Sequence, residues 1–168
     1  MIRILRQIFR TGIVTEPLPA SAEDEIKLVG TKLEETIRKR FSRSLTIRQV
    51  DAGSCNGCEL EIHAINNAYY NCERFGIHFT ASPRFADMLL VTGPVTHNME
   101  IALRRTYNAT PPPKLVVAVG DCGCNGGIFG ESYASLGGID KVIPVNIVIP
   151  GCPPTPIALL NGILKAVS

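Results

Sequence analysis

The sequence predicts an α/β fold in which a parallel sheet is covered by helices on both faces. From residue 45 onward, short β-branched and apolar runs alternate with stretches of helical pattern, which is the order that a parallel sheet with crossover helices requires. The length of 168 residues allows one domain with a single core. Pro111–Pro113 is a local stop before one of the strands rather than a linker.

Two helices are predicted ahead of the sheet. In residues 1–10, three arginines interleave with apolar residues in the pattern of a short basic amphipathic helix. Such a helix can lie on an anionic membrane surface or pack into a groove of a partner, and a frayed terminus is the third interpretation. After the Pro17-Leu18-Pro19 break, apolar residues at helical spacing predict a second helix that ends near residue 41.

The sheet and its helices then follow in alternation. We place the strands at Leu45–Val50, Ile77–Ala81, Met88–Thr92, Leu115–Val119 and Val145–Ile149, and the helices at Glu59–Tyr70, Asn98–Asn108 and Pro156–Val167. This order is typical of a doubly wound, flavodoxin-like parallel sheet. We therefore divide the chain into an N-terminal amphipathic and helical extension over residues 1–44, with a role in subunit docking, and a core domain over residues 45–168.

Composition and charge exclude several classes of protein. The net charge of +2 is too small to favour a nucleic-acid partner, which usually requires a strongly basic face. No stretch approaches the roughly 18 consecutive apolar residues of a spanning helix, and the start lacks a secretory pattern. We expect a cytoplasmic protein that reaches a membrane only through its partners.

Six cysteines without a secretion signal are more typical of metal ligands or reactive thiols than of disulfides. Cys55 and Cys58 follow the first predicted strand, Cys122 follows the fourth and Cys152 follows the fifth. The carboxyl ends of parallel strands share one edge of the sheet, where ligands bind in such folds. Three loops that are distant in sequence can therefore meet at one site.

Four cysteine thiolates are the usual ligands of a [4Fe–4S] cluster. A lone C-x-x-C also fits a zinc half-site or a thioredoxin-type pair. However, a thioredoxin pair does not need Cys122 and Cys152, and a structural zinc site usually has two close pairs. Cys72 is predicted to be a free thiol, whereas Cys124 competes with Cys122 as the third ligand, and spacing alone does not decide between these two.

Charged residues beside the first cysteine pair are candidates for moving protons. Glu59 directly follows Cys58, with Glu61 close behind, and either carboxylate could relay protons. The alternative for Glu59 is an exposed or interface carboxylate at a helix N-terminus. His63 is more typical of a surface or interface residue. Two arginines, at positions 74 and 84, could pair with a partner, offset a negative cluster or form ordinary surface pairs.

Several motifs, in order along residues 45–168, resemble one family. They are Gly53-Ser54-Cys55-Asn56-Gly57-Cys58-Glu59, Glu73-Arg74-Phe75-Gly76, Ser82-Pro83-Arg84, Ala86-Asp87, Val91-Thr92-Gly93-Pro94-Val95-Thr96, Gly120-Asp121-Cys122 with Gly126-Gly127, and Pro150-Gly151-Cys152-Pro153-Pro154. The chain resembles the small subunit of membrane-bound, energy-converting group 4 [NiFe]-hydrogenases, above all the formate hydrogenlyase type. The same superfamily includes the 20 kDa cluster-bearing subunit of respiratory complex I.

The resemblance implies one [4Fe–4S] cluster with the ligands Cys55, Cys58, Cys122 and Cys152. In the family pattern, three residues and then Gly-Gly follow the third ligand, which Cys122 satisfies and Cys124 does not. Complex I members typically have two adjacent cysteines in the first motif. Here Asn56-Gly57 separates the pair, as in hydrogenases, and this difference favours hydrogen chemistry over quinone chemistry.

The family also implies partners and a role. A separate large subunit would carry the NiFe centre, and this chain would relay electrons between that centre and a ferredoxin-like 2[4Fe–4S] subunit, with no turnover by this chain alone. Membrane antiporter-like subunits would hold the complex at the cytoplasmic face of the membrane. The alternative is the same relay in a quinone- or sulfur-reducing complex without nickel. Residues 10–17 resemble the start of the ferredoxin-like subunit, which implies a docking element.

Overall fold

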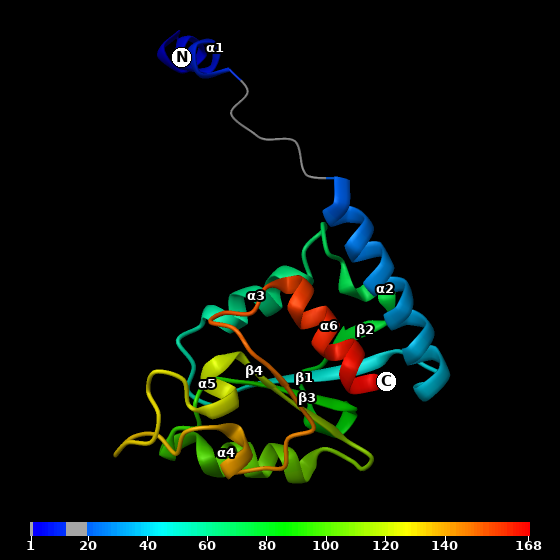
Figure 1. The fold of residues 1–168 in the computed structure, drawn as a ribbon, viewed down its shortest axis with the longest axis vertical. Coiled ribbons are helices and arrows are strands. Elements are labelled where there is room, and N and C mark those ends of the chain that lie inside the picture. Colours follow the sequence, from blue (N-terminus) through cyan, green and yellow to red (C-terminus); the bar gives the residue numbers. More distant parts are fainter. Residues whose placement is uncertain (1, 13–19) are drawn as a thin grey trace.

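The computed structural model describes residues 2–12 and 20–168. Its centre is a five-stranded sheet in the order β2-β1-β3-β4-β5, and every neighbouring pair is parallel (Figure 1). The strands are β1 (Leu45–Asp51), β2 (Ile77–Phe79), β3 (Met88–Thr92), β4 (Leu115–Val119) and β5 (Ile147–Ile149). This is the strand order of flavodoxin-like sheets, so the predicted fold class is confirmed.

Helices cover both faces of the sheet. They are α1 (Ile2–Thr11), α2 (Ala20–Phe41), α3 (Gly57–Ile65), α4 (His97–Ala109), α5 (Gly120–Asn125) and α6 (Pro156–Val167), with short 3-10 helices η1 (Cys72–Phe75), η2 (Pro83–Phe85) and η3 (Ile139–Lys141). Figure 1 shows α2, α3 and α6 on one side of the sheet and α4 on the other. Among the described helices, none is long and apolar enough to cross a membrane.

Side chains of the central strands alternate between two hydrophobic cores. On β3, Leu90 packs in the core beneath α2, α3 and α6, whereas Leu89 and Val91 pack in the core that includes Leu103 of α4. All five β3 residues are buried, which explains why this strand is a continuous apolar run in the sequence. The two cores hold the sheet between the helices and fix the positions of the strand ends.

Helix α2 belongs to the first of these cores. Its residues Val29, Leu33 and Ile37 are buried in the cluster that also contains the inner face of α6. Leu33 is fully buried. Although α2 precedes the division that we place at residue 44, it therefore shares the hydrophobic core of the sheet.

The structure differs from the predicted elements at the edge strands, where β2 ends at Phe79 rather than Ala81 and β5 begins at Ile147 rather than Val145, and in two segments near the cysteines. The helix expected over Glu59–Tyr70 ends at Ile65, because the Asn67 side chain accepts hydrogen bonds from the N–H groups of Tyr69 and Tyr70 and closes a turn. The segment after β4, expected as a loop, forms the short helix α5. Residues 13–19 lie outside the described residues, and with them most of the segment 10–17 for which docking is predicted.

Candidate functional site

Three chain segments meet at the carboxyl edge of the sheet, and all four predicted ligand cysteines lie there. They line one small cavity of about 40 Å³, whose walls are Ser54, Cys55, Gly57, Cys58, Gly93, Asp121, Cys122, Gly151, Cys152 and Pro153. In residues 2–12 and 20–168, no three His, Cys, Asp or Glu side chains are arranged to hold a single metal ion. None of the cysteines is in a disulfide.

The first segment is shaped by a carboxylate at the end of β1. Asp51 Oδ1 accepts hydrogen bonds of 2.8 Å from the N–H groups of both Gly53 and Ser54, which closes a tight turn. The chain then passes Cys55, which is exposed, and enters α3, whose first turn holds the half-buried Cys58. The turn thus brings both thiols of the C-x-x-C motif to the sheet edge.

A pair of hydrogen bonds ties the second and third segments together. The Asp121 N–H donates to the Gly151 carbonyl at 2.9 Å, and the Gly151 N–H donates to Asp121 Oδ1 at 2.8 Å. Each bond joins the residue before one cysteine to the residue before another, since Cys122 and Cys152 follow directly. The tie holds these two thiols at a fixed separation across the cavity.

Two glycines leave room for the thiols. Gly120 has φ +79, and a Cβ atom there would lie 2.6 Å from Cys58 Sγ. Gly127 has φ +55, and its Cβ would lie 2.8 Å from Cys122 Sγ. A side chain is therefore disfavoured at both positions for two reasons: the left-handed backbone and the lack of space.

The electrostatics of the cavity disfavour free thiolates. Burial, which is the largest cause, acts together with the nearby Glu59 and the other three cysteines of the cavity to raise the pKa of Cys58 to about 12. Burial and then the charges of Cys152, Cys55 and Asp121 also raise the pKa of Cys122. These thiols are therefore protonated at neutral pH unless a cationic group binds them.

The two remaining cysteines lie elsewhere. Cys124 is also in α5 but is absent from the cavity lining, and burial is the largest cause of its raised pKa. Cys72 is fully buried in the core below α2 and α6, and its Sγ donates to Asn66 Oδ1 at 3.1 Å. The structure thus brings together the four predicted ligands and leaves these two thiols apart.

Because Cys72 is buried, we expect the stability of the fold to decrease at alkaline pH. Desolvation raises the pKa of this thiol from 9.0 to about 11. Because the folded thiol holds its proton more tightly than the unfolded one, stability is unaffected below pH 9 and is lost as the pH rises toward 11. We expect the free energy of unfolding to fall by about 2 kcal/mol more in the wild type than in a Cys72→Ala variant over this range. Urea titrations at pH 8, 9, 10 and 11 measure it, and parallel profiles would contradict the prediction.

Glu59 is buried rather than exposed, which corrects the exposed alternative considered above. Only 5% of its surface is accessible, and its Oε1 accepts a hydrogen bond from the hydroxyl of Thr92 at the end of β3. Its Oε2 is buried and has no hydrogen-bond partner among the described residues. Glu61 is half-buried and His63 is exposed. A proton relay at Glu59 or Glu61 stays a prediction.

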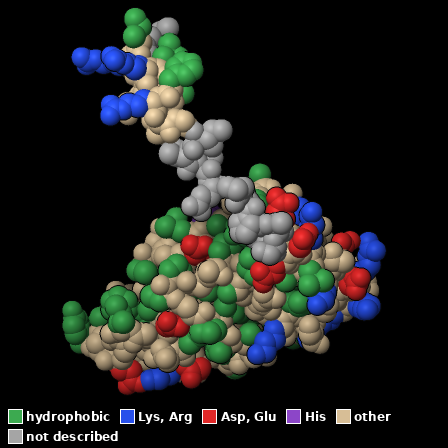
Figure 2. All heavy atoms as spheres, turned by 45° about the horizontal axis from the view of Figure 1, so that its top comes forward, with side chains coloured by type: hydrophobic (Ala, Val, Ile, Leu, Met, Phe, Trp, Pro, Cys, Tyr) green, Lys and Arg blue, Asp and Glu red, His purple; other side chains and the backbone are tan. Residues whose placement is uncertain are grey.

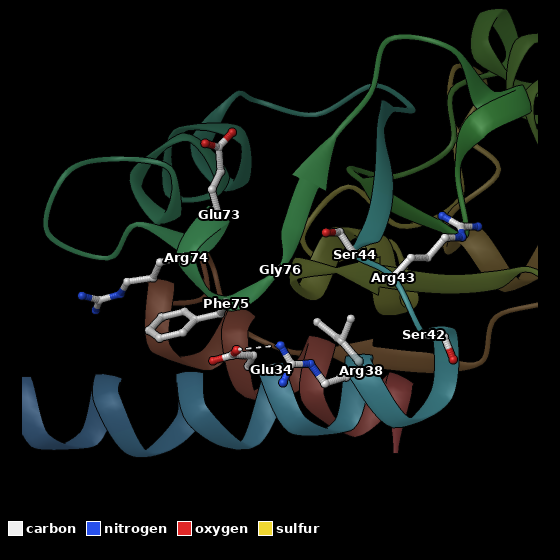
Figure 3. A pocket seen from close by; sticks show the side chains of 10 residues that line it. Glu34, Arg38, Ser42, Arg43, Ser44, Glu73, Arg74, Phe75 and Gly76 are labelled. Carbon is white, nitrogen blue, oxygen red and sulfur yellow. Dashed lines mark ion pairs between the residues drawn. The ribbon is translucent and has the colours of Figure 1, made fainter.

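The two singled-out arginines are exposed, and Arg74 lies away from the cysteines. Its guanidinium stacks over the Phe75 ring, 4.5 Å from the centroid. Arg74 and Phe75 border a polar cavity of about 350 Å³ at the amino ends of β1 and β2, opposite the cysteine edge (Figure 3). The Glu34–Arg38 ion pair, at 4.0 Å, lies on α2 beside it. Arg74 therefore cannot offset charge at the cysteine cavity.

Thr92, Asp51 and Asp121 were not predicted as parts of the site. Asp51 is two residues before a glycine, a signal for an Asx turn that sequence patterns can find. The Asp121–Gly151 tie and the Thr92–Glu59 bond have no such signal, since each joins residues about 30 apart in the chain. Only the packing of neighbouring strands brings these pairs together.

The chain is similar to known proteins along most of its length. It is 43% identical over 150 residues to formate hydrogenlyase subunit 7 of Escherichia coli (strain K12), a match that covers 89% of this chain and 57% of that subunit. It is 45% identical over 128 residues to the probable membrane-bound hydrogenase subunit mbhJ of Pyrococcus furiosus, covering 76% and 77% of the two chains. The chain thus spans little more than half the length of the first of these relatives.

A solved structure and a family model extend the comparison. A chain of the membrane-bound sulfane sulfur reductase (MBS), an archaeal respiratory membrane complex, superposes with a TM-score of 0.66 at 39% identity and covers 81% of this chain and 73% of its own. The family model of the NADH ubiquinone oxidoreductase 20 Kd subunit matches residues 55–166, from the first cavity cysteine into the last turn of α6. This protein therefore belongs to the family of the 20 Kd subunit of NADH ubiquinone oxidoreductase.

Proposed function

We propose that the chain holds one [4Fe–4S] cluster through Cys55, Cys58, Cys122 and Cys152 and relays electrons inside a membrane-bound [NiFe]-hydrogenase complex. The observation that carries the proposal is the convergence of these four thiols, from three distant segments, on one cavity. A bound cluster would supply reversible one-electron chemistry at this edge of the sheet.

The residues present fit such a cluster. The donors are four cysteine sulfurs with no histidine or carboxylate among the cavity walls except Asp121, whose side chain accepts the Gly151 N–H. The positions of Gly120 and Gly127, where any Cβ would meet a cysteine sulfur, leave the space around the thiols open. Sulfur-only donor sets of four are the usual ligands of this type of cluster.

The surface beside the cavity supports a relay that is covered by a partner. The segment after Cys122 carries Ile128, Phe129 and Tyr133, with 90%, 53% and 98% of their surfaces exposed. Exposed apolar groups concentrated in one segment are typical of a surface that a partner covers. A large subunit docked here would keep water from the exposed Cys55 and Cys152, as a low-dielectric relay requires.

The partners that we propose are the large subunit with the NiFe centre on one side and a ferredoxin-like 2[4Fe–4S] subunit on the other. Antiporter-like membrane subunits would complete the complex, with this chain peripheral at the cytoplasmic face. The support is the similarity to two proteins whose names are hydrogenase or hydrogenlyase subunits. The role of this chain is to hold the relay in place, and the oxidoreductase activity belongs to the assembled complex.

A second candidate is the same relay in a quinone- or sulfur-reducing complex without nickel. The observation that favours it is the structural similarity to a chain of a membrane-bound sulfane sulfur reductase. The separation of Cys55 from Cys58 by two residues is our reason to rank hydrogen chemistry first.

Metal analysis of the native complex separates the two candidates. An affinity tag on the C-terminus of this chain allows the complex to be purified under argon from detergent-solubilised membranes. We expect nickel together with iron and acid-labile sulfide, and hydrogen evolution from a reduced electron donor. Iron and sulfide without nickel would support the second candidate, whereas zinc without sulfide would overturn both.

A further inference from the structure

Helix α1 presents an apolar face that no described residue of the chain covers. Every residue from Ile2 to Gly12 is exposed, and the five large apolar side chains of the helix have between 50% and 86% of their surfaces accessible: Ile2, Ile4, Leu5, Ile8 and Phe9. An isolated helix of ten residues is marginal in water. A surface that buries these side chains must therefore stabilise α1.

The two kinds of side chain lie on opposite sides of α1. At about 100° per residue, the five apolar side chains occupy an arc of about 160°, while Arg3, Arg6 and Arg10 fall within about 60° on the other side. Figure 2 shows this division, with the arginines along one side of the helix and apolar groups along the other. The apolar arc is wider than the narrow seam by which one helix packs on another.

The charge of this segment is of one sign. Three arginines and no acidic residue occur in residues 1–15, and the polar side of α1 holds only these arginines with Gln7 and Thr11. A helix with a wide apolar face and an arginine-only charged face complements an interface of acyl chains beneath anionic phosphates. A groove in a protein partner would instead need acidic side chains along one of its edges, where they could pair with the three arginines of α1.

We propose that α1 is an interfacial anchor that lies flat on an anionic lipid surface, with its apolar face in the acyl boundary and its arginines at the phosphate headgroups. The anchor is a property of residues 2–11 and does not depend on the cysteine cavity. It gives this chain its own contact with the membrane, beside those made by the other subunits.

Vesicle sedimentation of the full-length chain tests the anchor. We expect the wild type to sediment with phosphatidylglycerol vesicles and to remain in solution with phosphatidylcholine vesicles. Replacing the three α1 arginines by glutamine (Arg3→Gln, Arg6→Gln and Arg10→Gln) is expected to lower the partition coefficient roughly 100-fold, since each cation near an anionic surface contributes about fivefold. The double variant Ile8→Gln with Phe9→Gln is expected to lower it about tenfold or more.

Matched variants elsewhere on the surface are the controls. Lys27→Gln, Lys32→Gln and Lys39→Gln together remove the same charge from exposed positions of α2, and Leu28→Gln with Ile101→Gln remove exposed apolar side chains. Both sets should sediment like the wild type, and circular dichroism confirms that every variant is folded. Absence of sedimentation, equal binding to neutral vesicles, or an unchanged partition of the arginine variant would overturn the proposal. If the arginine variant binds vesicles like the wild type but no longer co-purifies with another subunit of the complex, α1 binds a protein partner instead.

Discussion

Replacing Cys122 by alanine is expected to abolish cluster binding, whereas Cys124→Ala is expected to leave it near the wild-type level. Cys122 lines the cavity with the other three predicted ligands, and Cys124 does not. A cluster with three protein ligands and one water-exposed iron is easily lost from an open site, so the iron and sulfide content of Cys122→Ala should fall to a small fraction of the wild-type value. The measurement is iron and acid-labile sulfide per chain after anaerobic reconstitution.

The two substitutions are closely matched. Both replace a half-buried cysteine of the same six-residue helix by the better helix former alanine. Neither residue belongs to the buried core clusters, so the melting temperatures of the two apo variants should agree within a few degrees. If Cys124→Ala loses iron and Cys122→Ala keeps it, the third ligand is Cys124 and the assignment is wrong.

Spacing in the sequence could not separate these two cysteines, and the fold explains why. With the segment treated as a loop, a small shift would exchange residues 122 and 124. In α5 the backbone is helical, and side chains two positions apart point about 200° apart around the axis. Only one of them can therefore face the cavity. The helix itself is hard to predict because its six residues, GDCGCN, include two glycines and no apolar periodicity.

The central strands were predictable for the opposite reason. β3 and β4 begin and end at the predicted residues, because each is a run of buried apolar side chains with turn residues after it. The edge strand β5 is two residues shorter than predicted. At its start, the Asn146 N–H donates to the Val116 carbonyl at 2.9 Å, but the Val116 N–H donates to the Asn146 side chain at 2.8 Å instead of to a backbone carbonyl. Such substitutions of side chain for backbone have no periodic signal.

Within the candidate site, the positions of the cysteines could be predicted and their surroundings could not. Parallel strands place their carboxyl ends on one edge, so three cysteine-bearing segments were expected to converge. The burial of Glu59 depends instead on Thr92, which comes from the strand next to β1 in the sheet but is 33 residues away in the chain. A helix N-terminus usually favours an exposed carboxylate, and tertiary packing overrides that preference here.

Adding one methyl group at Gly127 is expected to destroy the cluster site, while the same change at Gly130 is tolerated. The two glycines have nearly the same left-handed backbone, with φ +55 and +53. A Cβ at Gly127 would lie 2.8 Å from Cys122 Sγ and 3.1 Å from Cys122 Cα and N, whereas nothing lies within 4 Å of a Cβ at Gly130. Both variants incur the cost of a left-handed alanine, about 1 kcal/mol. Only Gly127→Ala must also displace the thiol.

This pair of variants separates backbone strain from the geometry of the site. In urea titrations, the loss in the free energy of unfolding of Gly130→Ala measures the backbone cost alone, and Gly127→Ala should lose more stability because its contact involves backbone atoms of Cys122. Iron and sulfide content then reports the thiol alone: we expect near wild-type values for Gly130→Ala and at least a tenfold loss for Gly127→Ala. Full cluster content in Gly127→Ala would mean that Cys122 can move without cost, and that the position of its sulfur in the apo chain does not define the site.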